Sequence, residues 1–248
     1  MTSAYLNAIV KHCEGLAEAA RGDLDRPVEH CPGWNVADLV AHVTDVHWFW
    51  TEVVDGLLNE PPDVEQRPAR VANDRLIRRF LSGARGLVET LRMANQGAPC
   101  WTWAPLRHDV AFVTRHQAQE AAVHHWDAEN AAGHPIDLER EISADAIDEF
   151  LEFSVATEID PAQPGTPRLN GSFAMHATDI DKTWLVTDGG DEPARVKVLN
   201  VDSLATDNGV VAGTSSDLLL WLYARKDVDV LDISPELIDR FRKLCFTD

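Results

Sequence analysis

The stretch VAFVTRHQAQEAAVHHWDAENAAGHP, residues 110–135, predicts one long helix with a clear end. Its helical part covers about residues 110–132, because Gly133 is a frequent residue just past a helix C-terminus and Pro135 cannot continue the helix. Inside it, Glu120 stands four residues before His124. Residues four apart on an α-helix lie about 6 Å apart along the axis and point in nearly the same direction, so these two side chains can reach one ion.

Three earlier segments carry apolar residues at helical spacing. The first covers residues 4–20 and the third residues 76–95. The second begins after Asn35, a good N-cap with Asp38 in the capping-box position, and continues to about residue 58. Four helices with connections of moderate length indicate an antiparallel bundle.

A domain boundary is predicted in DPAQPGTPRLNG, residues 160–171, where proline and glycine cluster. Before it, a fifth helix over about residues 143–157 packs on the bundle or leads out of it. After it come three strands, a turn at DGGDEP, a possible strand at residues 209–212, a helix, a short strand and a last helix. The three strands are SFAMHATD, KTWLVTD and ARVKVLNV. The helix is SSDLLLWLYARK, the short strand is VDVLDI and the last helix is SPELIDRFRKL. We therefore expect an α+β protein of two domains, residues 1–160 and 168–248, the second a small α/β domain.

Composition limits the possible partners. The 248 residues carry a net charge of −19, which repels nucleic acids and anionic membrane surfaces. No apolar run approaches the length of a membrane span, and the N-terminal residues lack the pattern of a signal peptide, so a soluble cytoplasmic protein is expected. The four cysteines are scattered without metal-site spacing and are interpreted as reduced thiols. Oligomeric state cannot be deduced from these features.

A third metal ligand would have to come from a helix that faces Glu120 and His124. His42 is the leading candidate, since it lies on or beside the apolar face of the second helix, where an imidazole needs a partner. His47 is a rival, five residues further on. A catalytic zinc takes three nitrogen or oxygen ligands from the protein and keeps one position open. An ordinary polar helix face remains the alternative.

His116 and Asp127 flank this pair on the same helix face. Asp127 could bind a metal directly, but an indirect role, accepting a hydrogen bond from a ligand, or a place on the helix surface is preferred.

Three segments carry a resemblance to a known family. CPGWNVADLVAHVTDVHWFW and RHQAQEAAVHHWDAENAAGHP, together with VVAGTSSDLLLWLYAR, resemble the maleylpyruvate isomerase family of mycothiol-dependent enzymes, which belongs to the DinB-like helical-bundle group. The resemblance implies an N-terminal four-helix bundle with one divalent metal, typically zinc, and a C-terminal α/β domain similar to sterol-carrier proteins. The family's metal ligands match His42, Glu120 and His124.

The same resemblance implies a function. Family members use the metal with mycothiol, a small thiol of actinobacteria, and metal coordination lowers the pKa of a thiol so that a thiolate nucleophile exists at neutral pH. We expect an isomerase or S-transferase that acts on a small organic substrate, for example a dicarboxylate. The resemblance also implies an arginine near the substrate's carboxylates, which matches Arg225, although a solvated arginine near a helix end is an equal alternative.

Two other functions stay open at this stage. A zinc hydrolase would use the same three ligands with bound water as its nucleophile. A non-catalytic protein would bind a metal or small ligand without turnover. Neither the substrate nor the metal is identified by the sequence.

Overall fold

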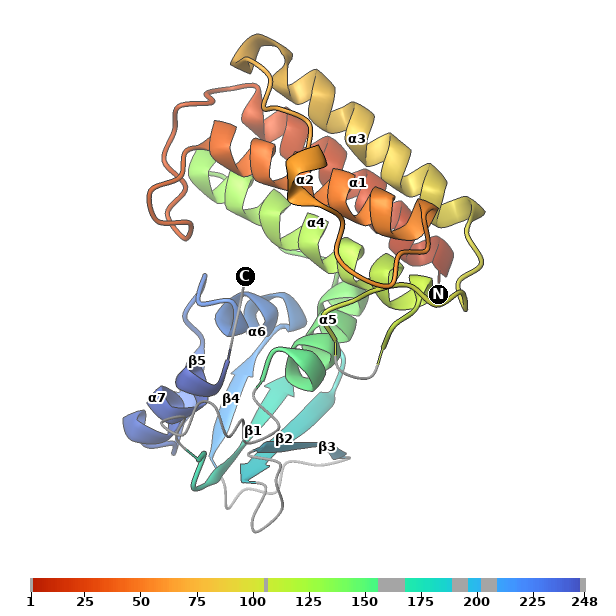
Figure 1. Cartoon of the computed structure of the whole chain (residues 1–248). Helices are drawn as coiled ribbons and strands as arrows, with labels where there is room; N and C mark the ends of the chain where they lie inside the picture. Colours follow the sequence, from red (N-terminus) through yellow and green to blue (C-terminus); the bar gives the residue numbers. More distant parts are fainter. Residues whose placement is uncertain (1, 105–106, 156–167, 189–195, 202–208, 246–248) are drawn as a thin grey trace. The chain divides into compact units, whose positions relative to one another are not determined.

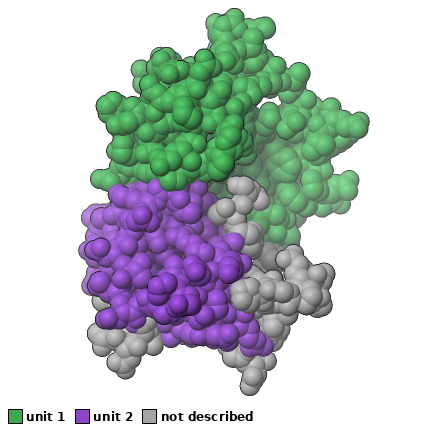
Figure 2. Space-filling view, turned by 90° about the vertical axis from the view of Figure 1, so that its left-hand side faces the viewer, with its two compact units in different colours: residues 1–138 green, residues 139–248 purple. Residues whose placement is uncertain are grey.

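The structure is a computed structural model that describes residues 2–104, 107–155, 168–188, 196–201 and 209–245. The chain forms two compact units, residues 1–138 and 139–248 (Figure 2). Each unit is described separately below. Within the described residues, no helix is both long enough and apolar enough to cross a bilayer.

Unit 1 is helical (Figure 1). Helix α1 contacts α3 and α4, and α2 also contacts both, so the four helices enclose one core. Aliphatic and aromatic side chains fill that core, among them Ile9, Leu39, Phe80 and Leu91, all fully buried. The elements are α1 (Thr2–Ala20), α2 (Val36–Asp55), the 3-10 turn η1 (Val64–Gln66), α3 (Asn73–Met93) and α4 (Val110–Ala132).

Local signals explain where the two site-bearing helices begin and end. Helix α2 starts at the predicted capping box, because the Asn35 side chain accepts from the Asp38 amide at 2.9 Å and the Asp38 carboxylate accepts from the Asn35 amide at 3.1 Å. Helix α4 starts after Asp109, whose side chain caps the Phe112 amide. It ends before Gly133, which has φ of 82°. The predicted bounds of α4 are confirmed.

The described part of unit 2 combines a sheet with helices α5, α6 and α7 (Figure 1). Its described strands lie in the order β3-β2-β1-β4-β5. Strand β1 pairs antiparallel with β2 and parallel with β4, while the outer pairs are antiparallel. The elements are α5 (Arg140–Phe153), β1 (Ser172–Ala177), β2 (Lys182–Asp188), β3 (Val196–Val201), β4 (Val210–Gly213), α6 (Ser215–Leu222), β5 (Asp229–Leu231) and α7 (Pro235–Leu244).

Aromatic side chains build the core of unit 2. The ring of Phe241 on α7 lies 5.0 Å from that of Phe173 on β1 and 5.9 Å from that of Trp221 on α6, and all three are buried. The whole chain is therefore α+β, as expected. The predicted strand at residues 209–212 is confirmed as β4, and Ser234 caps α7.

Unit 1 ends at Leu138 and unit 2 begins at Glu139, whereas the domain boundary is predicted in residues 160–171. Helix α5 belongs to unit 2 because its Asp148 accepts a hydrogen bond from the Trp184 indole at 2.7 Å and pairs with Lys182 at 2.5 Å. Its Phe150 ring also lies 5.0 Å from Tyr223. Residues 156–167 and the predicted turn at residues 189–193 lie outside the described residues.

The helix predicted over residues 215–226 is too long. The observed helix α6 ends at Leu222, and Tyr223 is its C-cap. Ala224 has a positive φ of 56°, a backbone conformation that does not occur within an α-helix. Arg225 therefore follows the helix and does not lie on it. Its guanidinium donates to the Tyr223 carbonyl at 3.0 Å and lies over the Tyr223 ring.

We predict that Gly15→Ala destabilises unit 1 by about 1–3 kcal/mol, because overpacking a core strains its neighbours. A methyl group at Gly15 of α1 would lie 2.2 Å from Nε2 of His125 on α4. The His125 ring is buried, and a hydrogen bond of 3.0 Å joins its Nδ1 to Nδ1 of His12, so the ring has little room to shift. Urea unfolding measures the change.

Gly86→Ala on α3 is the control for this substitution. A methyl group there meets nothing within 4 Å, so the change should raise stability by up to about 1 kcal/mol through helix propensity. Equal stability effects in the two variants would contradict the close contact between α1 and α4.

Candidate metal centre

Three side chains from α2 and α4 converge in unit 1. Oε1 of Glu120 lies 3.2 Å from Nε2 of His124 and 3.5 Å from Nε2 of His42. One ligand atom from each of the three residues lies within 4.8 Å of the others. Two donors held about 2.0–2.1 Å from a tetrahedral zinc lie about 3.3 Å apart, so these spacings fit a divalent ion.

Exposure increases from one side of this cluster to the other. The exposed fraction of the side chain is 10% for His124, 22% for Glu120 and 35% for His42. The ring of His42 also lies 4.9 Å from that of Trp34, in the segment before α2. A ligand that approaches from solvent would therefore meet the cluster on the His42 side.

The charges of the cluster favour a bound cation. Burial favours the neutral carboxyl of Glu120, but His124 and His42 outweigh burial and hold the pKa of Glu120 well below its usual range. Burial disfavours a charged His124, yet Glu120 and Asp127 overcome it and raise the pKa of His124 to about 9. The metal-free site thus binds a proton where a metal ion would bind, and metal binding requires that proton to leave.

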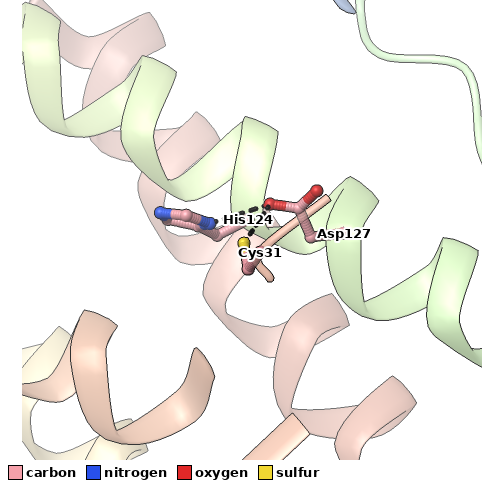
Figure 3. Close-up of side chains that lie close together, drawn as sticks. All are labelled: Cys31, His124 and Asp127. Atoms are coloured by element: carbon pink, nitrogen blue, oxygen red, sulfur yellow. Dashed lines mark hydrogen bonds and ion pairs between the residues drawn. The ribbon is translucent and has the colours of Figure 1, made fainter. Parts of the chain in front are cut away.

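Asp127 lies beside His124, next to its ring nitrogen Nδ1 (Figure 3). Its Oδ2 is 3.0 Å from Nδ1 of His124, and its side chain is fully buried. The expectation of a helix-surface position for Asp127 is therefore wrong, whereas an indirect role fits. A carboxylate that accepts from Nδ1 fixes the tautomer of the imidazole and leaves Nε2 free to bind a metal.

Cys31 is a neighbour that the sequence did not reveal. Its thiol lies 3.9 Å from Oδ2 of Asp127, so Cys31, His124 and Asp127 form a second possible ligand group (Figure 3). Both groups contain His124, but Glu120 of the first group lies at its Nε2, whereas Asp127 of the second lies at its Nδ1. Nothing in the spacing of Cys31 indicated this contact, because it joins residues 96 positions apart.

The other candidate histidines lie elsewhere in unit 1. His47 is only 2% exposed, stacks on Phe80 at 5.3 Å, and its Nε2 lies 3.6 Å from the thiol of Cys13. The ring of His116 lies between the aromatic residues Phe112 and Trp103, at 5.9 and 5.4 Å. Neither residue belongs to a group of possible metal ligands in the described part of the chain.

Residues 6–129 match the family model described as the mycothiol maleylpyruvate isomerase N-terminal domain, which is half of the chain. The chain belongs to this family. The match contains His42, Glu120 and His124, whereas Arg225 lies in unit 2, beyond it.

Solved structures of this family share the fold. A crystal structure of a mycothiol-dependent maleylpyruvate isomerase matches with a TM-score of 0.60 and 12% identity, over 93% of this chain and 92% of that chain. A structure of a mutant of that isomerase matches over the same shares, with a TM-score of 0.56 and 12% identity. Comparison with curated protein sequences finds no match. At this identity the likeness establishes the fold alone.

We predict that acid destabilises the metal-free protein through His47. Burial lowers the pKa of His47 from 6.5 to about 4, so the unfolded chain binds this proton more readily than the folded chain does. The free energy of unfolding should therefore fall between pH 6.5 and pH 4 by about 3 kcal/mol from this residue. Urea unfolding at several pH values measures it, and a His47→Gln variant should lack this part of the decline.

We also predict that Asp127→Asn weakens zinc binding by about 10- to 100-fold, because the amide holds the His124 imidazole less firmly. Competition with a chromogenic chelator measures the affinity. Asp74→Asn, at an exposed carboxylate of α3, controls for the lost charge.

Cys31→Ser separates the two ligand groups in the same assay. It should leave zinc affinity nearly unchanged if His42 and Glu120 complete the site. A loss of zinc in Cys31→Ser with full binding in His42→Ala would assign the metal to the other group.

Proposed function

We propose that the chain is a mycothiol-dependent isomerase or S-transferase that uses a divalent metal, most readily zinc, bound by His42, Glu120 and His124. The single observation that carries the proposal is the position of Oε1 of Glu120, which lies 3.2 and 3.5 Å from the Nε2 atoms of His124 and His42. The family match over residues 6–129 and the names of the solved relatives support the thiol.

The donor set suits an ion that activates a thiol. Two neutral imidazoles and one carboxylate leave a zinc site with a net positive charge and an open fourth position. A zinc ion bound there would lower the pKa of a coordinated thiol, so that thiolate is present at neutral pH. Asp127 would keep His124 oriented, and the more exposed His42 side would leave room for the thiol to enter.

The protein's own thiols support an external nucleophile. Burial raises the pKa of Cys13 and of Cys245 to about 12, and that of Cys100 to about 11. A thiol with such a pKa carries almost no thiolate at pH 7 and reacts slowly. The nucleophile is therefore expected to come from a small thiol and not from these three residues.

The reaction follows from thiolate addition to a conjugated double bond. The small thiol would supply a sulfur that adds to one carbon while the electron pair moves to the conjugated carbonyl, which would permit rotation about the new single bond. Departure of the same thiolate would restore the double bond in the isomer. In an S-transferase the adduct takes up a proton and leaves as product. Arg225 is proposed to bind a carboxylate of the substrate, a role that rests on the family resemblance.

The finer structural relationships are part of this proposal. Unit 1 is proposed to be a DinB-like four-helix bundle, and unit 2 to be similar to sterol-carrier proteins. Both follow from the family resemblance and agree with the all-helical and sheet-containing character of the two units. Small-molecule substrate and thiol are the proposed partners.

The proposal is tested by metal content and then by thiol binding. Protein purified without chelator should contain about one zinc or similar ion per chain, and His42→Ala and Glu120→Ala should lose it. His134→Ala, at an exposed histidine after α4, is the matched control and should keep it. In the cobalt-substituted protein, added mycothiol should produce a thiolate-to-cobalt charge-transfer band.

Three outcomes would contradict the proposal. A wild-type protein that stays empty after incubation with zinc has no metal site. A metal-containing protein that hydrolyses substrates without thiol is a zinc hydrolase. A metal-containing protein that shows neither the thiolate band nor any turnover is a binding protein.

A further inference from the structure

A groove of about 300 Å³ lies between α1 and α3, two helices of unit 1 that pack on each other. All of its lining residues belong to these two helices, whereas the proposed metal ligands lie on α2 and α4. The groove is therefore separate from the metal centre. Its volume lies at the lower end of the usual range for small-molecule sites, about 300–1,000 Å³.

The floor of this groove is apolar. On α3, Leu81, Ala84 and Val88 are spaced three and four residues apart, so they lie on one side of the helix. Helix α1 contributes Val10 and Cys13. Burial raises the pKa of Cys13 to about 12, so its thiol is uncharged at neutral pH. Val10 is 38% exposed, and an apolar group bound in the groove would remove this surface from water.

Charged residues border the groove. On α3, Glu89 and Arg92 pair with each other at 2.7 Å. The two other charged lining residues are Arg85 on α3 and Glu14 on α1, and both are exposed. Neither forms an ion pair with another described residue. The two helices thus present one cation and one anion, each without a partner, beside a shared apolar floor.

We propose that this groove binds an apolar α-amino acid, of which leucine is an example. Its carboxylate would pair with Arg85, its ammonium group with Glu14, and its side chain would lie on the apolar floor. A guanidinium can hold a carboxylate through two parallel hydrogen bonds, and hydrogen bonds between charged groups are the stronger ones. An acid without an amine would bring its charge near Glu14, and an amine without an acid would leave Arg85 without a partner. A zwitterion satisfies both residues, and this inference does not depend on the proposed function.

Leucine is the probe, and titration calorimetry on the whole protein measures its affinity. Arg85→Gln and Glu14→Gln should each bind leucine at least fivefold more weakly than wild type, a loss of about 1 kcal/mol. Both residues are exposed, so these variants should fold normally. Arg78→Gln and Glu18→Gln are the matched controls, at exposed residues of the same helices outside the groove, and should bind leucine as wild type does.

Three analogues separate the contacts of the ligand. N-acetylleucine lacks the ammonium group, leucinamide lacks the carboxylate and glycine lacks the apolar side chain. Each should bind wild type at least fivefold more weakly than leucine does. N-acetylleucine should bind Glu14→Gln no more weakly than wild type, and leucinamide should bind Arg85→Gln no more weakly than wild type, because each analogue already lacks the group that the substituted residue would contact.

Val10→Trp tests the position of the ligand. Because Val10 is partly exposed, a larger ring there can fill the groove from its edge, and leucine binding should be lost. Circular dichroism and urea unfolding show that the variant is folded. Undiminished leucine binding in folded Val10→Trp would overturn the inference.

Chelator treatment separates this groove from the metal centre, because free amino acids also chelate zinc. Leucine should bind with the same affinity to the protein as purified, to the chelator-treated protein and to His42→Ala. Binding that disappears in the last two would place leucine at the metal centre and overturn the inference. It is also overturned if leucine does not bind wild type, if Arg85→Gln and Glu14→Gln bind it as tightly, or if N-acetylleucine and leucinamide bind as well as leucine.

Discussion

The packing of α2 against α4 in unit 1 depends on one carboxylate oxygen. Oε1 of Glu120 on α4 lies between two imidazoles, His124 on its own helix and His42 on α2. A half-buried carboxylate is costly unless cationic or hydrogen-bonding groups surround it, so the charge of Glu120 and the contact between α2 and α4 stabilise each other. The same convergence of donors leaves a place that only a cation satisfies, whether a proton on His124 or a metal ion.

The sequence predicted best what is decided within one helical turn. The capping box of Asn35 and Asp38, the end of α4 at Gly133 and the pairing of Glu120 with His124 depend only on neighbouring residues, and all appear in the structure. Burial alone does not single out the proposed third ligand, His42. The more buried histidine of α2 is His47, whose ring stacks on Phe80 and whose Nε2 lies near the thiol of Cys13.

Features that join distant segments could not be predicted in this way. The contact of Cys31 with Asp127 depends on how a loop folds back on α4, and the groove between α1 and α3 depends on how two helices pack. In the same way, the sequence favoured a longer α6 over residues 215–226, but the positive φ of Ala224 ends it and places Arg225 after the helix. Helix α5 belongs to unit 2 through Asp148, a contact with β2 that helical periodicity cannot encode.

The arrangement of unit 1 suggests why one residue is the meeting point of the proposed reaction. Burial raises the pKa of three of the protein's own thiols, Cys13, Cys100 and Cys245, so these three are poor nucleophiles and the proposed nucleophile is a small thiol from solvent. The exposed fractions of the cluster direct its approach to the His42 side. A thiol bound at the proposed metal would thus meet its substrate on the His42 side, and bound orientation of this kind accelerates bimolecular addition.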